Sequence, residues 1–156
     1  MAEFDQVRRL RVLAAGVSGA QVAERFVPAS FDQVWALVAD LEHELGTFEP
    51  DFHRVTVRRV DDRVEAHVRG RIGFRARFDV DLEPGWCWMQ SRFLMIGIAA
   101  APVPGGTLVA ATGGLRIPGR AALVPFAVLR ANRRALRRLA ARIEAAGPAA
   151  TAAEGR

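Results

Sequence analysis

The sequence predicts a single α+β domain in which a long C-terminal helix packs across a curved antiparallel sheet. Two patterns indicate this architecture. Residues 52–117 alternate apolar and polar side chains between closely spaced turn signals, whereas the residues after Pro118 follow the period of an amphipathic helix. The chain has 156 residues, the length of one domain, and 51% of them are apolar, which is enough to form a buried core.

Residues 1–20 are expected to form a short amphipathic helix or a loose arm. Their apolar side chains recur at helical spacing as far as Val17, and Gly16 and Gly19 end the pattern. The ends of protein chains are often unstructured, so both forms remain open. The folded domain is placed at residues 21–146.

The domain is expected to begin with one strand followed by two short helices. Residues 21–27 alternate like a strand that stops at Pro28, and Ser30 is placed to cap a helix. A second helical turn over 41–45 breaks at Gly46. The buried stripe of the first helix recurs at i, i+3, i+4 and i+7, and comprises Phe31, Val34, Trp35 and Val38.

Antiparallel strands are expected from Phe52 to about Ile117. The clearest is 74–82, in which apolar residues alternate with Arg and Asp, so one face should be buried and the other exposed to water. The turns between the strands are signalled by Asp61-Asp62, Gly70, Pro84-Gly85 and Pro104-Gly105-Gly106.

The last element is expected to be a long helix from Pro118-Gly119 to about Ala146. Residues 147–156 are expected to form a disordered, Ala-rich tail. At about 3.6 residues per turn, a narrow apolar stripe lies opposite a broad arginine face. The stripe comprises Leu129, Asn132, Leu136, Leu139 and Ile143, and the arginine face comprises Arg130, Arg133, Arg134, Arg137 and Arg138.

The net charge of +5 is unevenly distributed along the chain. All 22 basic residues are arginines, and eight of them lie between Arg116 and Arg142 with no acid among them. A solvated helix face is the plainer interpretation, and salt-sensitive contact with an anionic surface is the alternative. A nucleic acid is the less favoured anionic partner, because no exposed aromatic side chains are interleaved with these arginines.

Several classes of protein have no support in the sequence. The chain contains no GxGxxG, GxxxxGKS/T, HExxH, GxSxG or CxxC motif, so no cofactor is expected. Its three histidines are isolated, so no metal is expected either. Cys87 is the only cysteine, and neither a membrane span nor a signal peptide is found. A cytoplasmic protein is therefore expected.

The order of elements and several motifs resemble the START-like superfamily, the SRPBCC proteins, which include polyketide cyclases and Bet v 1-like proteins and have a helix-grip fold. The resemblance covers roughly residues 21–146. It implies an elongated cavity between sheet and long helix that takes a small apolar or aromatic molecule, of polyketide or lipid type. The residues that match are Val27-Pro28-Ala29-Ser30, Val34-Trp35, Ala39-Asp40, Leu82-Glu83-Pro84-Gly85 and Gly105-Gly106-Thr107. Such motifs mark a fold and not a reaction.

Asn132 is the most informative single residue, because it lies in the middle of the apolar stripe of the long helix. A buried amide must find hydrogen-bond partners. Either it bonds to backbone or side chains in the core, or it faces the cavity and orients a ligand. The sequence leaves the two alternatives even.

The three histidines are weaker candidates than Asn132 for a role in the cavity. His53 shares its parity with Val55 and Val57, which points it inward near the start of a strand. A partly exposed residue at a strand end is favoured over a cavity acid or base. His67 and His43 are expected to be exposed to solvent.

The strand after Pro84-Gly85 can pair in two registers. A two-residue loop places Cys87 and Met89 inside and leaves Trp86, Trp88, Gln90 and Arg92 outside. One more loop residue reverses this, so that Trp88, Gln90 and Arg92 line the cavity, where the arginine could hold an enolate or a carboxylate. Pro-Gly suits a type II turn, and two outward tryptophans would be unusual unless they form an interface, so the second register is preferred. A homodimer is left open.

The remaining ligand candidates follow from where a helix-grip cavity would open. They are Phe48, Phe52, Phe126 and Leu129. By contrast, Trp35, Phe31, Phe74 and Phe78 are expected to pack in the core.

Three functions remain open on the sequence. The first is a cyclase or aromatase in which Arg92, Asn132 or His53 polarises a carbonyl or moves a proton. The second is a non-catalytic carrier or sensor of a hydrophobic ligand, which is slightly favoured because the chain has no Tyr and only one inward histidine is expected. The third is an interaction module that uses the arginine face of the last helix.

Overall fold

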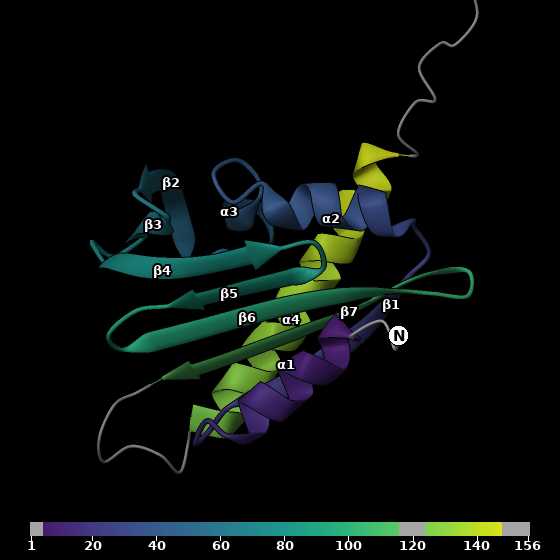
Figure 1. Cartoon of the computed structure of the whole chain (residues 1–156), viewed down its shortest axis with the longest axis horizontal. Coiled ribbons are helices and arrows are strands. Elements are labelled where there is room, and N and C mark those ends of the chain that lie inside the picture. The colour runs from purple at the N-terminus through teal and green to yellow at the C-terminus, as the bar shows by residue number, and fades with distance from the viewer. Residues whose placement is uncertain (1–4, 116–123, 148–156) are drawn as a thin grey trace, which may run out of the picture.

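The computed structural model describes residues 5–115 and 124–147, which form a seven-stranded antiparallel sheet flanked by helices on both faces (Figure 1). The spatial order of the strands is β1-β7-β6-β5-β4-β3-β2. The helices are α1 (Gln6–Ala15), α2 (Phe31–Ala39), α3 (Leu45–Phe48) and α4 (Val124–Ala146). The strands are β1 (Gln21–Val27), β2 (Phe52–Val60), β3 (Arg63–Gly70), β4 (Arg75–Glu83), β5 (Trp86–Gln90), β6 (Leu94–Val103) and β7 (Gly106–Leu115). The predicted α+β helix-grip architecture is confirmed.

The main core lies between the inner face of the sheet and helices α2, α3 and α4. The buried stripe of α4 includes Leu136, Leu139 and Ile143, which join a cluster with Phe78 and Met89 of the sheet. The helix ends at Gly147, whose φ of 69° suits only a residue without a Cβ. Residues 148–156 of the expected tail lie outside the described residues. No helix in the described part of the chain is long and apolar enough to cross a membrane.

The turn from β1 into the first helix of the domain forms as its sequence predicts. Ser30 caps α2 by accepting a hydrogen bond from the backbone N–H of Gln33, whose side chain in turn accepts from the N–H of Ser30. Val34 and Val38 are buried, while Phe31 and Trp35 stack at the edge of the core with ring centroids 6.2 Å apart. Contrary to the prediction, Gly46 does not end the next helical segment but lies inside α3.

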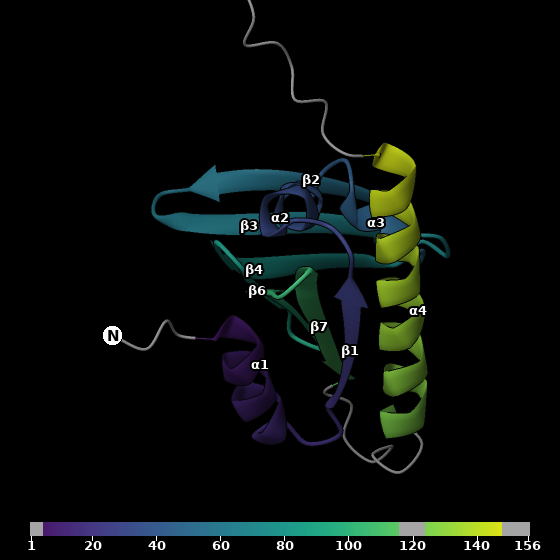
Figure 2. The same ribbon diagram turned by 90° about the vertical axis from the view of Figure 1, so that its right-hand side faces the viewer.

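Helix α1 packs on the face of the sheet opposite to α4, as Figure 2 shows. Val7 and Leu10 are fully buried there in a second cluster with Trp86, Ala99 and Ala110. This close approach depends on a glycine. A Cβ on Gly97 would lie only 2.8 Å from Cδ1 of Leu10. The segment 1–20, expected to be a helix or an arm, therefore contains a docked helix.

The preferred register of the strand after Pro84-Gly85 was wrong. Glu83 pairs with Trp86 and Leu82 with Cys87, which leaves a two-residue loop. Gly85 has a φ of 77°, as a type II turn requires at its second central position. Trp86 and Trp88 therefore point away from α4, yet Trp86 is 1% exposed because α1 covers it. An outward tryptophan is buried here because α1 packs on the outer face of the sheet.

Candidate functional site

A cavity of about 460 Å³ lies at one end of the sheet, between the first half of α4 and the ends of several strands. Its walls come from the α3–β2 connection, the turn between β3 and β4, the start of β6, the end of β7, and α4. The volume is in the range of small-molecule sites. The lining residues are Glu49, Asp51, Phe52, Gly70, Arg71, Ile72, Phe74, Leu94, Met95, Ile96, Gly113, Gly114, Ala127, Val128, Ala131 and Asn132.

The wall of this cavity is mostly apolar. Phe52 is 5% exposed and is held by Phe78, whose ring centroid lies 5.9 Å away. At the rim, Ile72 is 98% exposed and Phe74 is 46% exposed, although Phe74 was expected to lie in the core. Large apolar side chains exposed around a concave site favour an apolar ligand.

Asn132 forms a hydrogen bond to the backbone and also lies in the cavity wall. It is 6% exposed, and its Nδ2 donates a 3.0 Å hydrogen bond to the carbonyl oxygen of Gln21 at the start of β1. Its Oδ1 lies beside Gly113, 3.5 Å from where a Cβ would be. Among the described residues no donor reaches this oxygen. An amide has two N–H donors and one acceptor oxygen, so part of its capacity remains for a ligand.

Glu49 is the second polar group of the cavity. It follows α3 directly, and its carboxyl has no hydrogen-bond or ion-pair partner among the described residues. Burial raises its pKa from 4.5 to about 7, and the charge of Asp51 adds to this rise while Arg138 opposes it. A carboxyl that titrates near neutrality in a cavity can give or take a proton.

Of the three phenylalanines and the leucine predicted as ligand contacts, only one phenylalanine lines the cavity. Phe52 lines the cavity. Phe48 is 1% exposed and packs in the main core, and Leu129 packs against that core without lining the cavity. Phe126 is 86% exposed and is also absent from the wall.

His53 does not point inward, contrary to the parity argument. A β-bulge between Phe52 and Arg54 inserts one residue at this point of β2. Phe52 and Val55 are consequently both buried, whereas His53 is exposed. It borders a smaller hollow of about 210 Å³ that also includes His43. Parity along a strand fails across a bulge.

Trp88, Gln90 and Arg92 do not line the cavity. Trp88 and Gln90 lie on the outer face, where Trp88 stacks on Trp86 with centroids 5.8 Å apart. Arg92 lies in the turn between β5 and β6, exposed, with its guanidinium 5.2 Å from the ring of Phe93. The turn that contains Arg92 ends the strand expected after Pro84-Gly85 at Gln90, and a separate strand, β6, begins at Leu94.

Sequence reasoning missed Glu49. The segment Glu49-Pro50-Asp51 matches no motif, and only its place just before Phe52 hinted at the cavity. Its significance depends on its place in the folded chain, where it shares the cavity wall with residues of α4 and of the turn between β3 and β4. Within the described residues no group of three or more His, Cys, Asp or Glu side chains could hold a metal ion.

Comparisons with known proteins place the fold. No protein-family model matches the chain, and no curated protein matches it in sequence. Among solved structures, a protein from Thermus thermophilus is 22% identical with a TM-score of 0.61, over 82% of this chain and 99% of that one. A START superfamily protein from Mycobacterium smegmatis is 16% identical with a TM-score of 0.62, over 81% and 98%.

A third similar structure is the di-domain ARO/CYC StfQ from the steffimycin biosynthetic pathway. It is 13% identical with a TM-score of 0.64, over 90% of this chain and 55% of StfQ. These likenesses establish a START-like, helix-grip fold for this chain, as the sequence resemblance implied.

Proposed function

We propose that this protein binds a small, largely apolar molecule that carries a carbonyl or hydroxyl group, in the cavity between α4 and the sheet. The observation that supports this is the pairing of an apolar wall with two incompletely satisfied polar groups, Glu49 and Oδ1 of Asn132. The side chains of Asn132 and Glu49 thus keep hydrogen-bonding capacity at an apolar wall, and small-molecule sites are mostly apolar with a few placed polar groups.

The first test is a native mass spectrum of freshly purified protein beside a denatured one. A reproducible extra mass that is lost on denaturation would support an occupied cavity. Binding is then measured by titration with the neutral fluorescent probe N-phenyl-1-naphthylamine, so that the many arginines do not contribute by charge.

A matched pair of α4 variants locates the probe. Ala131 lines the cavity and Ala141 does not, although both are exposed alanines of the same helix. Ala131→Phe fills the cavity and should weaken probe binding at least about tenfold, equivalent to about 1.4 kcal/mol. Ala141→Phe should leave it unchanged. Equal effects of the two variants would contradict the cavity as the binding site.

A second candidate function is catalysis of the aromatase/cyclase type, to which the likeness to the ARO/CYC protein StfQ is relevant through the fold alone. Glu49 favours it. As a carboxylate it could take a proton from a carbon next to a ligand carbonyl, so that the C–H bond breaks and its electron pair forms an enolate. The free N–H of Asn132 could hold the enolate oxygen. A carrier would need neither step.

Deuterium exchange at the central carbon of an aromatic β-diketone separates the two candidates. For the enzyme, wild-type protein accelerates the exchange with a rate that rises as Glu49 ionises, and Glu49→Gln abolishes the acceleration while still binding the neutral probe. For the carrier, exchange in the presence of wild-type protein equals that with Glu49→Gln at every pH.

A further inference from the structure

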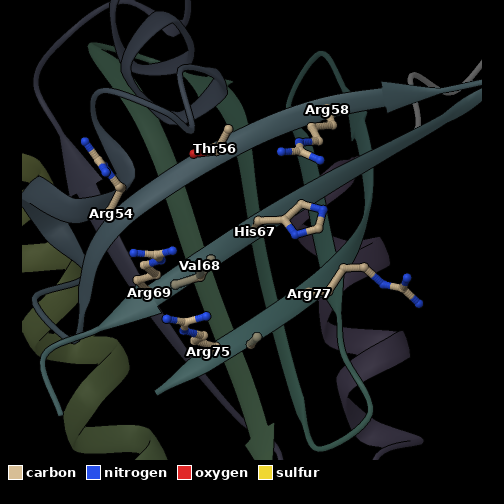
Figure 3. Close-up of a pocket in the computed structure, with 9 residues that line it drawn as sticks. Arg54, Thr56, Arg58, His67, Val68, Arg69, Arg75 and Arg77 are labelled. Carbon is tan, nitrogen blue, oxygen red and sulfur yellow. The ribbon is translucent and has the colours of Figure 1, made fainter. Parts of the chain in front are cut away.

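The outer face of β2, β3 and β4 carries a groove of about 390 Å³ that shares no lining residue with the cavity beside α4 (Figure 3). Its polar residues lie on the exposed side of the three strands, at positions that alternate with Val55, Val68 and Phe78 of the main core. Val68 and Ala76 also border the groove. We call it the arginine groove. Its basic residues are Arg54, Arg58, His67, Arg69, Arg75 and Arg77.

Like charges face one another directly in this groove. Arg54 pairs across the strands with Arg69, and Arg69 pairs with Arg75, so three arginines form one row. Figure 3 shows these side chains at the same end of the three strands. In the next row, His67 lies opposite Arg77. Like charges at directly opposed positions destabilise a sheet.

Acidic side chains do not neutralise this charge. Within the described residues, none of the five arginines of the groove forms a salt bridge or a side-chain hydrogen bond. Elsewhere in the chain arginines do pair with acids, as Arg142 does with Glu44 at 2.8 Å. Glu65 lies nearby, but its carboxylate is 3.3 Å from the ring of His67.

The chemistry of the groove selects its ligand. A guanidinium donates two parallel hydrogen bonds to one phosphate. The two rows are about 7 Å apart, and their long arginine side chains can converge on one chain of linked phosphates. Among the described residues that line the groove there is no Phe, Tyr or Trp on which bases could stack. Along the strands the next row contains Glu65 and Asp79, which would repel a long polyanion.

We propose that the arginine groove binds a small molecule with two or more linked phosphate groups. Its volume is that of a small-ligand site, and it lies on the opposite side of the sheet from the core packed under α4. The groove shares no lining residue with the cavity, and the proposal does not depend on the function assigned to the cavity.

Calorimetric titration of the full chain with inorganic triphosphate tests the proposal. The variant Arg69→Gln/Arg75→Gln should bind triphosphate at least about tenfold more weakly, since each arginine supplies charge-assisted hydrogen bonds. The control Arg133→Gln/Arg137→Gln removes the same net charge from the exposed face of α4 and should bind like wild type. Arg69→Lys/Arg75→Lys keeps the charge but not the paired donors and should lie between wild type and the glutamine variant.

Three outcomes would overturn the proposal. The first is no triphosphate binding at about 50 mM NaCl, where ionic contacts are still strong. The second is equal weakening by the groove variant and the α4 control, which would make the effect one of net charge. The third is binding of a short DNA duplex or of anionic vesicles through Arg69 and Arg75 when triphosphate does not bind. Thermal melts of each variant exclude loss of folding as the cause.

Discussion

The side-chain amide of Asn132 on α4 donates a 3.0 Å hydrogen bond to the carbonyl oxygen of Gln21 at the start of β1. The same oxygen accepts a 2.9 Å hydrogen bond from Oγ1 of Thr112 on β7. One backbone carbonyl therefore links the long helix to two strands. Because this contact fixes the amide of Asn132, it also fixes which polar atoms remain for the cavity.

We expect the stabilities of Asn132 and Thr112 variants to be coupled. Asn132→Ala or Thr112→Val alone should each cost about 1 kcal/mol, because the carbonyl of Gln21 keeps its other partner. The double variant should lose more than the two costs together, since that buried oxygen then has neither side-chain donor. Urea unfolding of the four proteins gives the coupling energy. Additive costs would contradict a shared acceptor.

The fold was largely predictable from the sequence because its signals are local. Three segments show this, because each has one period and one buried face. They are the capped helix after Ser30, the alternating strand 74–82 and the apolar stripe of α4. Asn132 stood out for the same reason, as a polar residue within an apolar stripe.

The site was only partly predictable because its remaining features are set by contacts between distant segments. Glu49 becomes unusual only when α4 and the β3–β4 turn enclose it. The bulge after Phe52 changes which side of β2 faces the core, and α1 buries Trp86 on the outer face of the sheet, whereas the preferred register turned the tryptophans of this strand toward the cavity. The bulge and the covering by α1 leave no periodic pattern in the sequence from which they could be predicted.

The raised pKa of Glu49 predicts a loss of stability with rising pH. Between its unfolded value of 4.5 and its folded value of about 7, the folded chain keeps a proton that the unfolded chain has released. Stability should therefore be unaffected by this group below pH 4.5, fall through that window, and be lowered by about 3 kcal/mol above it.

The variant Glu49→Gln removes this titration. It should match wild type in urea unfolding near pH 4 and be the more stable protein near pH 8, by about the same amount. Glu144→Gln, which replaces an exposed carboxyl of α4, serves as the control and should follow wild type throughout. A stability difference for Glu49→Gln that does not change with pH would refute the raised pKa.

Docking of α1 should contribute strongly to the stability of the whole domain. Leu10 is fully buried against the outer face of the sheet, so Leu10→Ala should cost about 2–4 kcal/mol. Val12 on the same helix is 67% exposed, and Val12→Ala should change stability by about 0.5 kcal/mol or less. Denaturant unfolding measures the free energy that each variant loses. Similar losses for Leu10→Ala and Val12→Ala would mean that α1 is a loose arm.

Cys87 should be chemically inert in the folded protein. It is 1% exposed, and burial raises the pKa of its thiol to about 12, with a further contribution from the charge of Asp81. A thiol reagent such as dithionitrobenzoate should therefore react only after denaturation. Rapid labelling of the native protein at neutral pH would mean that the core around β5 opens readily.

The row of opposed arginines in the arginine groove should lower stability in the absence of a ligand. Arg69 faces Arg54 on one side and Arg75 on the other, so Arg69→Gln relieves two repulsive pairs at once. We expect a gain of about 0.5 kcal/mol or less, because these side chains are exposed and screened by water. The gain should shrink as salt is added, whereas removing a packing defect would stabilise the protein equally at every salt concentration.

Arg137→Gln on α4 provides the comparison, and an equal gain from it would assign the effect to net charge. A salt-dependent gain specific to Arg69 would mean that the groove keeps its charge at the expense of stability, as expected of a surface that binds an anion.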